Sequence, residues 1–296
     1  RHDSGGNPAV IPELTYEQFV AFHTRYYHPS NARIVVYGDI PTEEYLAFLD
    51  EEFLSQFTDH PVPGPIPEQP RWDAPRTVET TYPLDGVEDT TRRSSVTVNW
   101  LLFPVTETRR LLATSVMTEI LFGHSGSPLT KALIDSGLGQ DLSPLIGLET
   151  DLHEAVFSAG LRGTDPDSKQ AIETVIFDTL RGLVRDGIPA ELVEGALRRV
   201  EFRNRELKGG PNGMRVLRRV LRTWMYGAGP NTALNFGNDI TDLRERVEAT
   251  PRFFEGLIDE LLLENTHRTT VVVRPDPEQS AREATVLETE LSGRSA

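Results

Sequence analysis

The two ends of this chain carry the same succession of sequence features, and this internal correspondence limits the possible folds more than any other property. Near each end, a helix-forming segment rich in aromatic residues or leucine is followed by a short loop, an arginine, a valine-rich stretch and a turn containing Asp and Pro. The two arginines, Arg33 and Arg268, lie 235 residues apart. A correspondence over this distance indicates tandem domains rather than a solenoid.

The expected division of the chain follows from this correspondence and from the prolines. Residues 1–57 are expected to be the C-terminal end of a truncated preceding domain, and residues 76–290 a complete second domain. Six prolines between residues 61 and 75 exclude a helix and favour extended polyproline geometry. We therefore expect a semi-rigid linker at residues 58–75, and a short charged tail at residues 291–296.

Hydrophobic periodicity predicts helices and strands in a mixed order. Helices are expected at residues 15–27, 42–57, 106–122, 129–135, 168–186, 190–207 and 213–225, with a last helix that ends at residue 263. Strands are expected at residues 34–37, 76–82, 94–103, 142–148, 155–162 and 269–273. Because strands and helices do not alternate strictly, we expect an α+β fold with two layers, an antiparallel or mixed sheet and helices packed on one face.

Local signals indicate where several helices begin. Thr15 and Gln18 have the spacing of a capping box. Ser127 and Thr250 are each followed by proline, which is typical of an N-cap residue and the first helical position.

Composition argues against several classes of function. The 296 residues include 45 acidic and 30 basic side chains, and the net charge of −15 disfavours nucleic acid, whose binding depends on neutralising phosphates. No apolar run approaches the about 18 residues of a membrane-spanning helix. Because the chain has no cysteine, it has no disulfide, thiolate nucleophile or Cys-ligated zinc. We expect a protein of the bacterial cytoplasm that binds neither nucleic acid nor membrane.

Two short motifs resemble the nucleophile loops of serine hydrolases. In serine proteases of the chymotrypsin type a His base and an orienting Asp lie upstream in an all-β chain, whereas only Arg1 and His2 precede Asp3-Ser4-Gly5-Gly6 in this helix-rich sequence. Residues 123–127, Gly-His-Ser-Gly-Ser, lack the final glycine of a nucleophile elbow and follow a helix-forming segment instead of a strand. We expect a flexible turn at the first motif and a turn between two helices at the second. A serine hydrolase acting through Ser125 stays open as an alternative.

The histidines form no recognisable metal motif. A helical zinc site places two histidines four residues apart with a glutamate between them, whereas His23 and His28 are five apart and fall on different faces. His153 precedes Glu154 but has no second histidine within reach along its strand. By itself, the chain therefore shows no metal site.

The densest charged feature is basic. Nine Lys and Arg residues lie between residues 198 and 222, and on the helix expected at 213–225 four arginines share one face, Arg215, Arg218, Arg219 and Arg222. Two explanations stay open. The arginines either form solvated helix faces paired with nearby acids, or make a positive wall that faces an anionic ligand or an acidic partner domain.

Longer stretches spread over almost the whole chain are similar to one protein family. They are Ser-Gly-Gly-Asn-Pro at residues 4–8, Val-Ile-Pro-Glu-Leu-Thr-Tyr-Glu-Gln-Phe at 10–19, Tyr-Tyr-His-Pro-Ser-Asn-Ala-Arg at 26–33, and residues 37–39, 99–102, 127–129, 135–139, 201–202, 265–268 and 275–277. In these stretches the chain resembles the presequence proteases, one branch of the pitrilysin and insulin-degrading-enzyme family of metallopeptidases.

The resemblance implies a clamshell of four homologous α/β domains that closes around a chamber for short unfolded peptides. In that family the first domain holds zinc through a His-x-x-Glu-His motif and a distal Glu, and the last domain adds Arg and Tyr. The metal polarises the scissile carbonyl and the motif glutamate activates water. No position of this chain matches these groups. Residues 1–57 would then end the catalytic-type domain and residues 76–290 would be the second, non-catalytic domain. Zinc is expected in the parent protein and not in this chain.

The resemblance also implies partners, namely the remaining domains of the parent peptidase and its peptide substrates. In insulin-degrading enzyme the second domain holds peptide N-termini against an exposed strand edge by strand addition. The corresponding pieces here are the turn at residues 124–127 and a strand at residues 145–148. The candidate substrate-binding residues are His124, Gly126, Ser127, Leu145, Ile146, Gly147 and Leu148. Gly147 would allow a peptide backbone to approach closely, or would mark a simple bulge or bend. A stand-alone inactive binding or scaffold subunit stays open as a different class of function.

Overall fold

A mixed sheet of six strands organises the chain. The computed structural model describes residues 6–7, 10–61, 66–86, 89–205 and 212–295. The strand order is β1-β6-β2-β5-β3, with β4 also paired to β5, and only the β1–β6 pair is parallel. The strands are β1 (Arg76–Pro83), β2 (Ser94–Pro104), β3 (Asp141–Leu142), β4 (Gly147–Glu149), β5 (Glu154–Thr164) and β6 (Arg268–Asp276).

Alternation along the central strand β2 determines which face of the sheet is covered. Val98 and Trp100 are fully buried on the same face, as a period of two requires. Val98 lies between Ala159 of β5 and Thr270 of β6. The indole N–H of Trp100 donates to the carbonyl of Leu262 at 2.9 Å, which satisfies the one polar atom of this core side chain.

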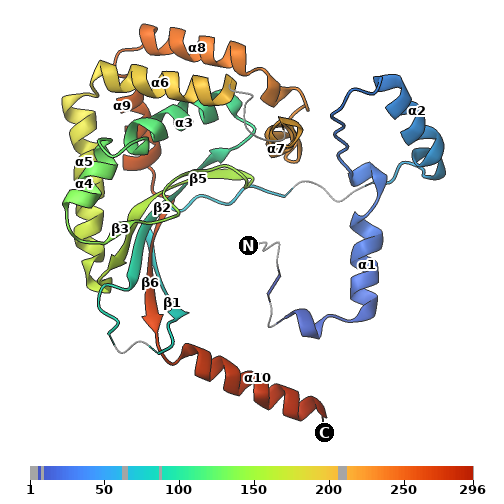
Figure 1. The fold of residues 1–296 in the computed structure, drawn as a ribbon, viewed down its shortest axis with the longest axis horizontal. Helices are drawn as coiled ribbons and strands as arrows, with labels where there is room; N and C mark the ends of the chain where they lie inside the picture. Colours follow the sequence, from blue (N-terminus) through green and yellow to red (C-terminus); the bar gives the residue numbers. More distant parts are fainter. Residues whose placement is uncertain (1–5, 8–9, 62–65, 87–88, 206–211, 296) are drawn as a thin grey trace.

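Helices cover one face of the sheet and leave the other face open (Figure 1). The covering layer consists of α3 (Thr108–Phe122), α4 (Pro128–Asp135), α5 (Lys169–Asp186), α6 (Ala190–Arg205), α8 (Phe236–Ala249) and α9 (Phe253–Ile258). Sheet and helices share one core, whose largest fully buried side chains include Trp100, Phe157, Phe254 and Met117. The predicted α+β fold, a mixed sheet with helices on one face, is confirmed.

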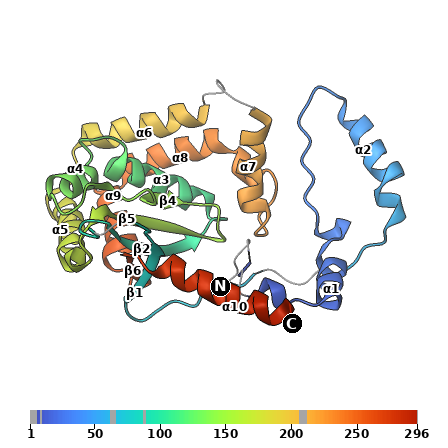
Figure 2. The ribbon, with the colours of Figure 1, turned by 60° about the horizontal axis from the view of Figure 1, so that its bottom comes forward.

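Residues 10–60 lie beside these two layers (Figure 2). In α1 (Tyr16–Tyr26) the predicted capping box is confirmed: the Thr15 hydroxyl accepts from the N–H of Gln18 at 3.2 Å, and Gln18 Oε1 accepts from the N–H of Thr15 at 2.9 Å. The second helix, α2 (Thr42–Glu52), is shorter than predicted, and a 3-10 turn, Leu54–Gln56, follows it.

The strand predicted at residues 34–37 is wrong. This segment is extended but pairs with no strand in the described part of the chain, and Ile34 and Val36 are 43% and 46% exposed. A valine-rich segment becomes a strand only when a neighbouring strand accepts its backbone hydrogen bonds. Here the segment lies beside α7 (Asn212–Trp224), and the Arg33 guanidinium lies 5.5 Å from the Trp224 ring centre.

A single strand at residues 142–148 is also wrong, because β3 and β4 are separated by a turn. The Ser143 carbonyl accepts from the N–H of Ile146 at 3.3 Å, and the Ser143 hydroxyl accepts from the N–H of Leu145 at 3.4 Å. Pro144 has no N–H to give to a ladder. Turn chemistry therefore interrupts an otherwise apolar stretch.

The C-terminal third contains a helix that the sequence did not predict and a different helix start. The unpredicted helix is α8, and α9 begins after Arg252, whose φ of 59° is left-handed, so Thr250 does not cap it. A π-helical turn, Asp259–Leu263, completes this helical segment. The last helix, α10 (Gln279–Ser295), runs past residue 290, so the predicted boundary between domain and tail falls inside a helix.

The predicted linker contains no helix at residues 58–61 and 66–75. Two of its prolines, Pro63 and Pro65, lie outside the described residues, as do Ser4 of the first hydrolase-like motif and Lys208 of the basic stretch.

Candidate functional site

The turn that joins α3 to α4 is held by hydrogen bonds among its own residues. The Ser127 hydroxyl accepts from the N–H of His124 at 3.2 Å, and Nδ1 of His124 accepts from the N–H of Gly126 at 3.1 Å. Ser127 is fully buried, whereas His124 and Gly126 are exposed. Ser127 is the N-cap residue of α4, as predicted, but its side chain makes no capping hydrogen bond to the helix. Pro128 does occupy the first helical position.

The buried carboxylate of Glu119 explains why glycine stands at position 123, where this turn begins. Glu119 is 6% exposed and forms ion pairs with Arg199 at 2.6 Å and with Arg203, both from α6. A Cβ at Gly123 would come within 2.3 Å of both the Glu119 carbonyl oxygen and its Oε1. Burial raises the pKa of Glu119, but the hydrogen bonds and charges of the two arginines outweigh burial and hold it below its usual value. The C-terminal part of α3, which leads into the turn, is thus joined to α6 through this carboxylate.

Only half of the predicted contact strand is a strand. Gly147 and Leu148 belong to β4, where Gly147 pairs with Ser158, but Leu145 and Ile146 lie in the preceding turn. Leu145 is 71% exposed. Gly147 has a φ of 97°, and a Cβ there would meet Thr118 only at 3.5 Å. Backbone conformation rather than crowding therefore favours glycine at this position.

The structure brings the two groups of candidate residues to the same margin of the sheet. α3 contacts β4, and α4 contacts β3, so the turn between these helices lies near the edge formed by the two short strands. Ser125, the alternative nucleophile, is exposed in a turn that follows a helix. A nucleophile elbow follows a strand, so this geometry does not strain the serine into an active position.

The polar face of β2 was not singled out by sequence. On the face opposite Trp100, the Asn99 amide donates to the Thr97 hydroxyl at 3.0 Å and to the Thr269 carbonyl at 3.2 Å, and its Oδ1 accepts from the Ser158 hydroxyl at 2.8 Å. The alternation of Thr97 and Asn99 with apolar residues was the available signal. These bonds cross three adjacent strands of the open face.

The end of the linker is fastened to the domain. Glu154, which is 6% exposed, accepts from the N–H of Gln69 at 2.7 Å and from Arg71 at 2.6 Å. Trp72 stacks on His267 with 4.1 Å between ring centres. Burial and the charge of Arg71 lower the pKa of His267, and Glu154 opposes them in part.

The described histidines other than His124 lie against another ring. His153 stacks on Tyr226 at 4.8 Å, and His28 contacts the ring of Phe57 at 5.5 Å. Over the described ranges, no three His, Cys, Asp or Glu side chains are grouped so that they could hold a metal ion. In the same ranges no helix has the length and apolar content needed to cross a bilayer.

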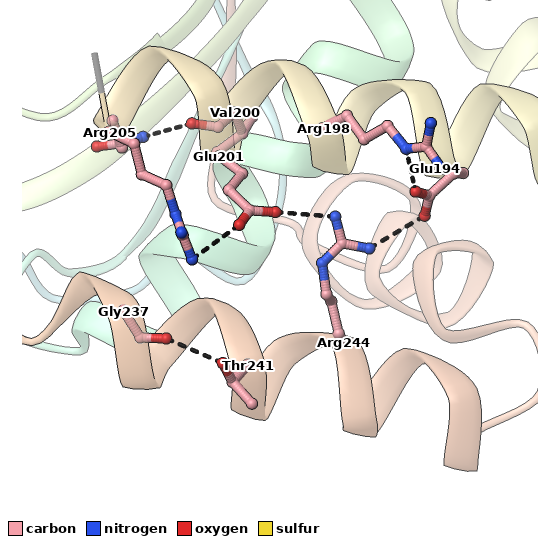
Figure 3. A network of polar contacts seen from close by, with 9 residues as sticks. Glu194, Arg198, Val200, Glu201, Arg205, Gly237, Thr241 and Arg244 are labelled. Atoms are coloured by element: carbon pink, nitrogen blue, oxygen red, sulfur yellow. Dashed lines mark hydrogen bonds and ion pairs between the residues drawn. The ribbon is translucent and has the colours of Figure 1, made fainter.

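Most of the basic stretch on α6 is paired with acids. Figure 3 shows Arg244 of α8 bridging Glu194 at 3.1 Å and Glu201 at 3.0 Å, while Arg198 and Arg205 pair with the same two glutamates. These contacts support the first of the two explanations for α6. On α7, Arg219 donates to the amide oxygen of Asn204 at 3.1 Å.

Known proteins match this chain along nearly all of its length. The family profile described as "Peptidase M16 inactive domain" matches residues 13–200. The chain is 35% identical over 289 residues to presequence protease 1 of Arabidopsis thaliana, 32% identical over 288 residues to the mitochondrial presequence protease of Mus musculus, and 32% identical over 290 residues to protein HypA of Clostridium perfringens. These alignments cover 95–97% of this chain but only 26–29% of the relatives. The chain spans less than a third of their length.

Solved structures share the fold. The crystal structure of a peptidase M16 inactive domain from Pseudomonas fluorescens has a TM-score of 0.68 at 17% identity, covering 93% of this chain and 61% of that one. A protease from Helicobacter pylori has a TM-score of 0.65 at 19% identity, covering 91% of this chain and 61% of its own. With the profile match over more than half of its residues, the chain belongs to the M16, or pitrilysin, family of peptidases and carries the inactive domain of that family.

Proposed function

We propose that this chain is the non-catalytic part of a zinc-dependent metalloendopeptidase of the presequence-protease type, which degrades short unfolded peptides. The observation that carries this proposal is the alignment itself, which covers almost all of this chain and little more than a quarter of each presequence protease. In this proposal residues 1–57 end the preceding domain, residues 58–75 link the two, and residues 76–290 form the second domain. Zinc and the hydrolytic groups belong to the remainder of the parent protein.

The open face of the sheet supports a role as a chamber wall. Thr97, Asn99 and Ser158 satisfy one another by hydrogen bonds on this face. Polar groups that are already paired gain little from a passing peptide, so an unfolded chain is not trapped on such a wall.

The margin formed by β3, β4 and the turn at residues 124–127 supports peptide contact by strand addition. Leu145 is the most exposed apolar side chain there. In the parent protein, Leu145→Asp should raise KM for unfolded peptides by placing a charge in the contact. Leu234→Asp, at another exposed leucine between α7 and α8, is the matched control and should leave KM unchanged. Equal effects of the two substitutions would argue against this contact.

Exposed aromatic residues on the first two helices support docking against the remaining domains of the parent. Phe19 and Phe22 of α1 are 65% and 58% exposed, and Phe48 of α2 is 62% exposed. Large apolar side chains in this number mark a surface that another domain covers. The net charge of −15 supports peptide and protein partners over nucleic acid, and we propose the bacterial cytoplasm as the compartment.

Peptide cleavage by the parent and by this chain tests the assignment. Chelation should stop cleavage by the parent, and this chain alone should cleave no peptide even with added zinc. Zinc-dependent cleavage by the chain alone would overturn the proposal. A reading frame that starts immediately before Arg1, with no His-x-x-Glu-His motif upstream, would instead support a stand-alone inactive subunit.

A further inference from the structure

A basic pocket lies where β1 begins, between the sheet and α5. Its volume is about 350 Å³, and its wall includes Arg76 of β1, Arg268 of β6, and Glu173, Phe177 and Arg181 of α5. Three guanidinium groups therefore line this pocket against one carboxylate. Glu173 accepts a hydrogen bond from the Thr270 hydroxyl and offsets part of this positive charge, so the wall keeps an excess of arginines over carboxylates. In a chain with a net charge of −15, the pocket concentrates positive charge.

Arg268 is held in this pocket by contacts with a backbone carbonyl and an aromatic ring. Its guanidinium donates to the Asn265 carbonyl at 2.7 Å and lies 4.9 Å from the ring centre of Phe177. Burial lowers the pKa of Arg268, Glu173 opposes this effect, and Arg181 adds to it. Because the Asn265 carbonyl and the Phe177 ring hold the Arg268 guanidinium, an incoming anion would meet a donor group that is already oriented.

Arg76 and Arg181 contribute the other two positive charges of the pocket. Arg76 lies over Trp72 at 3.9 Å and, among the described residues, has no ion-pair partner. Arg181 is 63% exposed, and its one ion pair there, with Asp178, joins neighbouring turns of α5 at 3.1 Å. Such an exposed pair contributes little and is easily exchanged for another carboxylate.

The pocket lies at the end of a free strand edge. In the described part of the chain β1 pairs with β6 alone, and all of its residues except Tyr82 are exposed. An edge strand offers backbone N–H and C=O groups to another chain. A peptide added antiparallel to β1 reaches Arg76 with its C-terminus, whereas a parallel peptide would bring its ammonium group toward the arginines. Charge therefore selects the antiparallel direction.

We propose that β1 and this pocket bind the C-terminal end of an extended peptide. The peptide adds antiparallel to the edge of β1, and its terminal carboxylate lies among Arg76, Arg181 and Arg268, where planar guanidinium groups match its two oxygens. This site is at the opposite edge of the sheet from β3 and β4. It does not rest on the function proposed above, and either proposal can fail alone.

Fluorescence anisotropy with the intact chain tests this site. The probe is a fluorescein-labelled hexapeptide of alternating threonine and valine with a free C-terminus, compared with the same peptide as a C-terminal amide. The free acid should bind about tenfold more tightly than the amide, the effect of losing one charge-assisted contact. Arg181→Gln should weaken binding of the acid about three- to tenfold and leave the amide unchanged. Arg185→Gln, one turn further along α5 and 75% exposed, is the matched control and should change neither.

Three results would overturn the proposal. Equal affinity for the free acid and the amide would show that the pocket does not bind the C-terminal carboxylate. Equal losses of affinity in Arg181→Gln and Arg185→Gln would show that the peptide responds to the positive charge of α5 in general and not to this pocket. An amidated peptide with one internal glutamate that binds as tightly as the free acid would assign the pocket to side chains instead of chain ends. N-methylation of alternate residues in the free acid should weaken binding, because strand addition needs those N–H groups.

Discussion

At the scale of single residues, the buried carboxylate of Glu119 joins two helices. Glu119→Gln leaves Arg199 and Arg203 with a neutral partner, and because both arginines keep contact with water, the cost should be about 1–3 kcal/mol. Urea unfolding at pH 7 measures this loss. The control is Glu194→Gln on α6, whose carboxylate is 42% exposed and whose loss should cost less than about 1 kcal/mol. Equal losses of unfolding free energy in the two variants would mean that burial adds nothing to the ion triad of Glu119, Arg199 and Arg203.

The same carboxylate makes stability depend on acid. The pKa of Glu119 is lower in the folded chain than the value of 4.5 that applies when it is unperturbed. The ion triad therefore stabilises the fold above pH 4.5, and this contribution is lost as the pH falls through the folded pKa. Unfolding curves between pH 6 and pH 3 should decline less steeply in Glu119→Gln than in the original chain. A parallel decline would place the acid sensitivity in other carboxylates.

His267 makes stability depend on pH in a second, higher pH range. Its pKa is lowered from 6.5 because the side chain is buried against Trp72 and close to Arg71. Below pH 6.5 the unfolded chain binds a proton that the folded chain resists, so stability decreases as the pH falls from this value. His267→Phe keeps the stacked ring and should remove this slope between pH 7.5 and 5.5 in thermal unfolding. His124→Phe, in an exposed turn, is the control that should retain the slope.

At the scale of elements, the linker is ordered by its contacts with the sheet and not by its prolines alone. Trp72 stacks on His267, carries Arg76 on its ring, and accepts from the Thr266 hydroxyl through its carbonyl at 2.6 Å. Trp72→Ala should therefore accelerate hydrogen exchange at residues 69–74, measured by mass spectrometry, without changing exchange in β2. Glu68→Ala is the control. Equal acceleration in both variants would contradict the conclusion that the contacts of Trp72 order the linker.

Sequence predicted the elements that carry their own periodicity. The capping box at Thr15 and the alternation along β2 depend on residues a few positions apart, and both are confirmed. The segment at residues 34–37 has the composition of a strand but finds no partner strand in the described chain. α8 begins Phe-Gly-Asn-Asp, which favours a turn, and packing of Ile240 and Leu243 into the core overrides that preference.

The candidate site was predictable in position more than in detail. The turn at residues 124–127 lies between two helices as predicted, but the hydroxyl of Ser127 bonds backward to His124 instead of forward into α4. Both choices satisfy one buried hydroxyl, and sequence does not distinguish them. The basic pocket joins Arg76, Arg181 and Arg268, which lie about a hundred residues apart along the chain. The pairing of β1 with β6 and the packing of α5 beside them bring these residues together.

At the scale of the whole molecule, the folded core excludes the N-terminal region. The buried core residues begin at Val96 and end at Val272, and none comes from residues 10–60. The first helices, α1 and α2, have no buried residue of their own. Residues 33–37 touch α7 through Arg33 on Trp224 and through Tyr37 against Gly213. This interface is small beside the core that unites the sheet with its helices.

A chain shortened to residues 66–296 should therefore unfold cooperatively at nearly the same temperature. The truncation removes chiefly the cation–π pair of Arg33 and Trp224, worth about 0.5–1 kcal/mol at an exposed site. For a domain of this size such a change lowers Tm by about 1–4 °C. Differential scanning calorimetry of both chains measures the shift, and Trp224→Ala in the full chain should reproduce most of it. A broad, non-cooperative transition in the shortened chain would mean that residues 1–60 are needed to complete the fold, and that the second domain is not an independent unit.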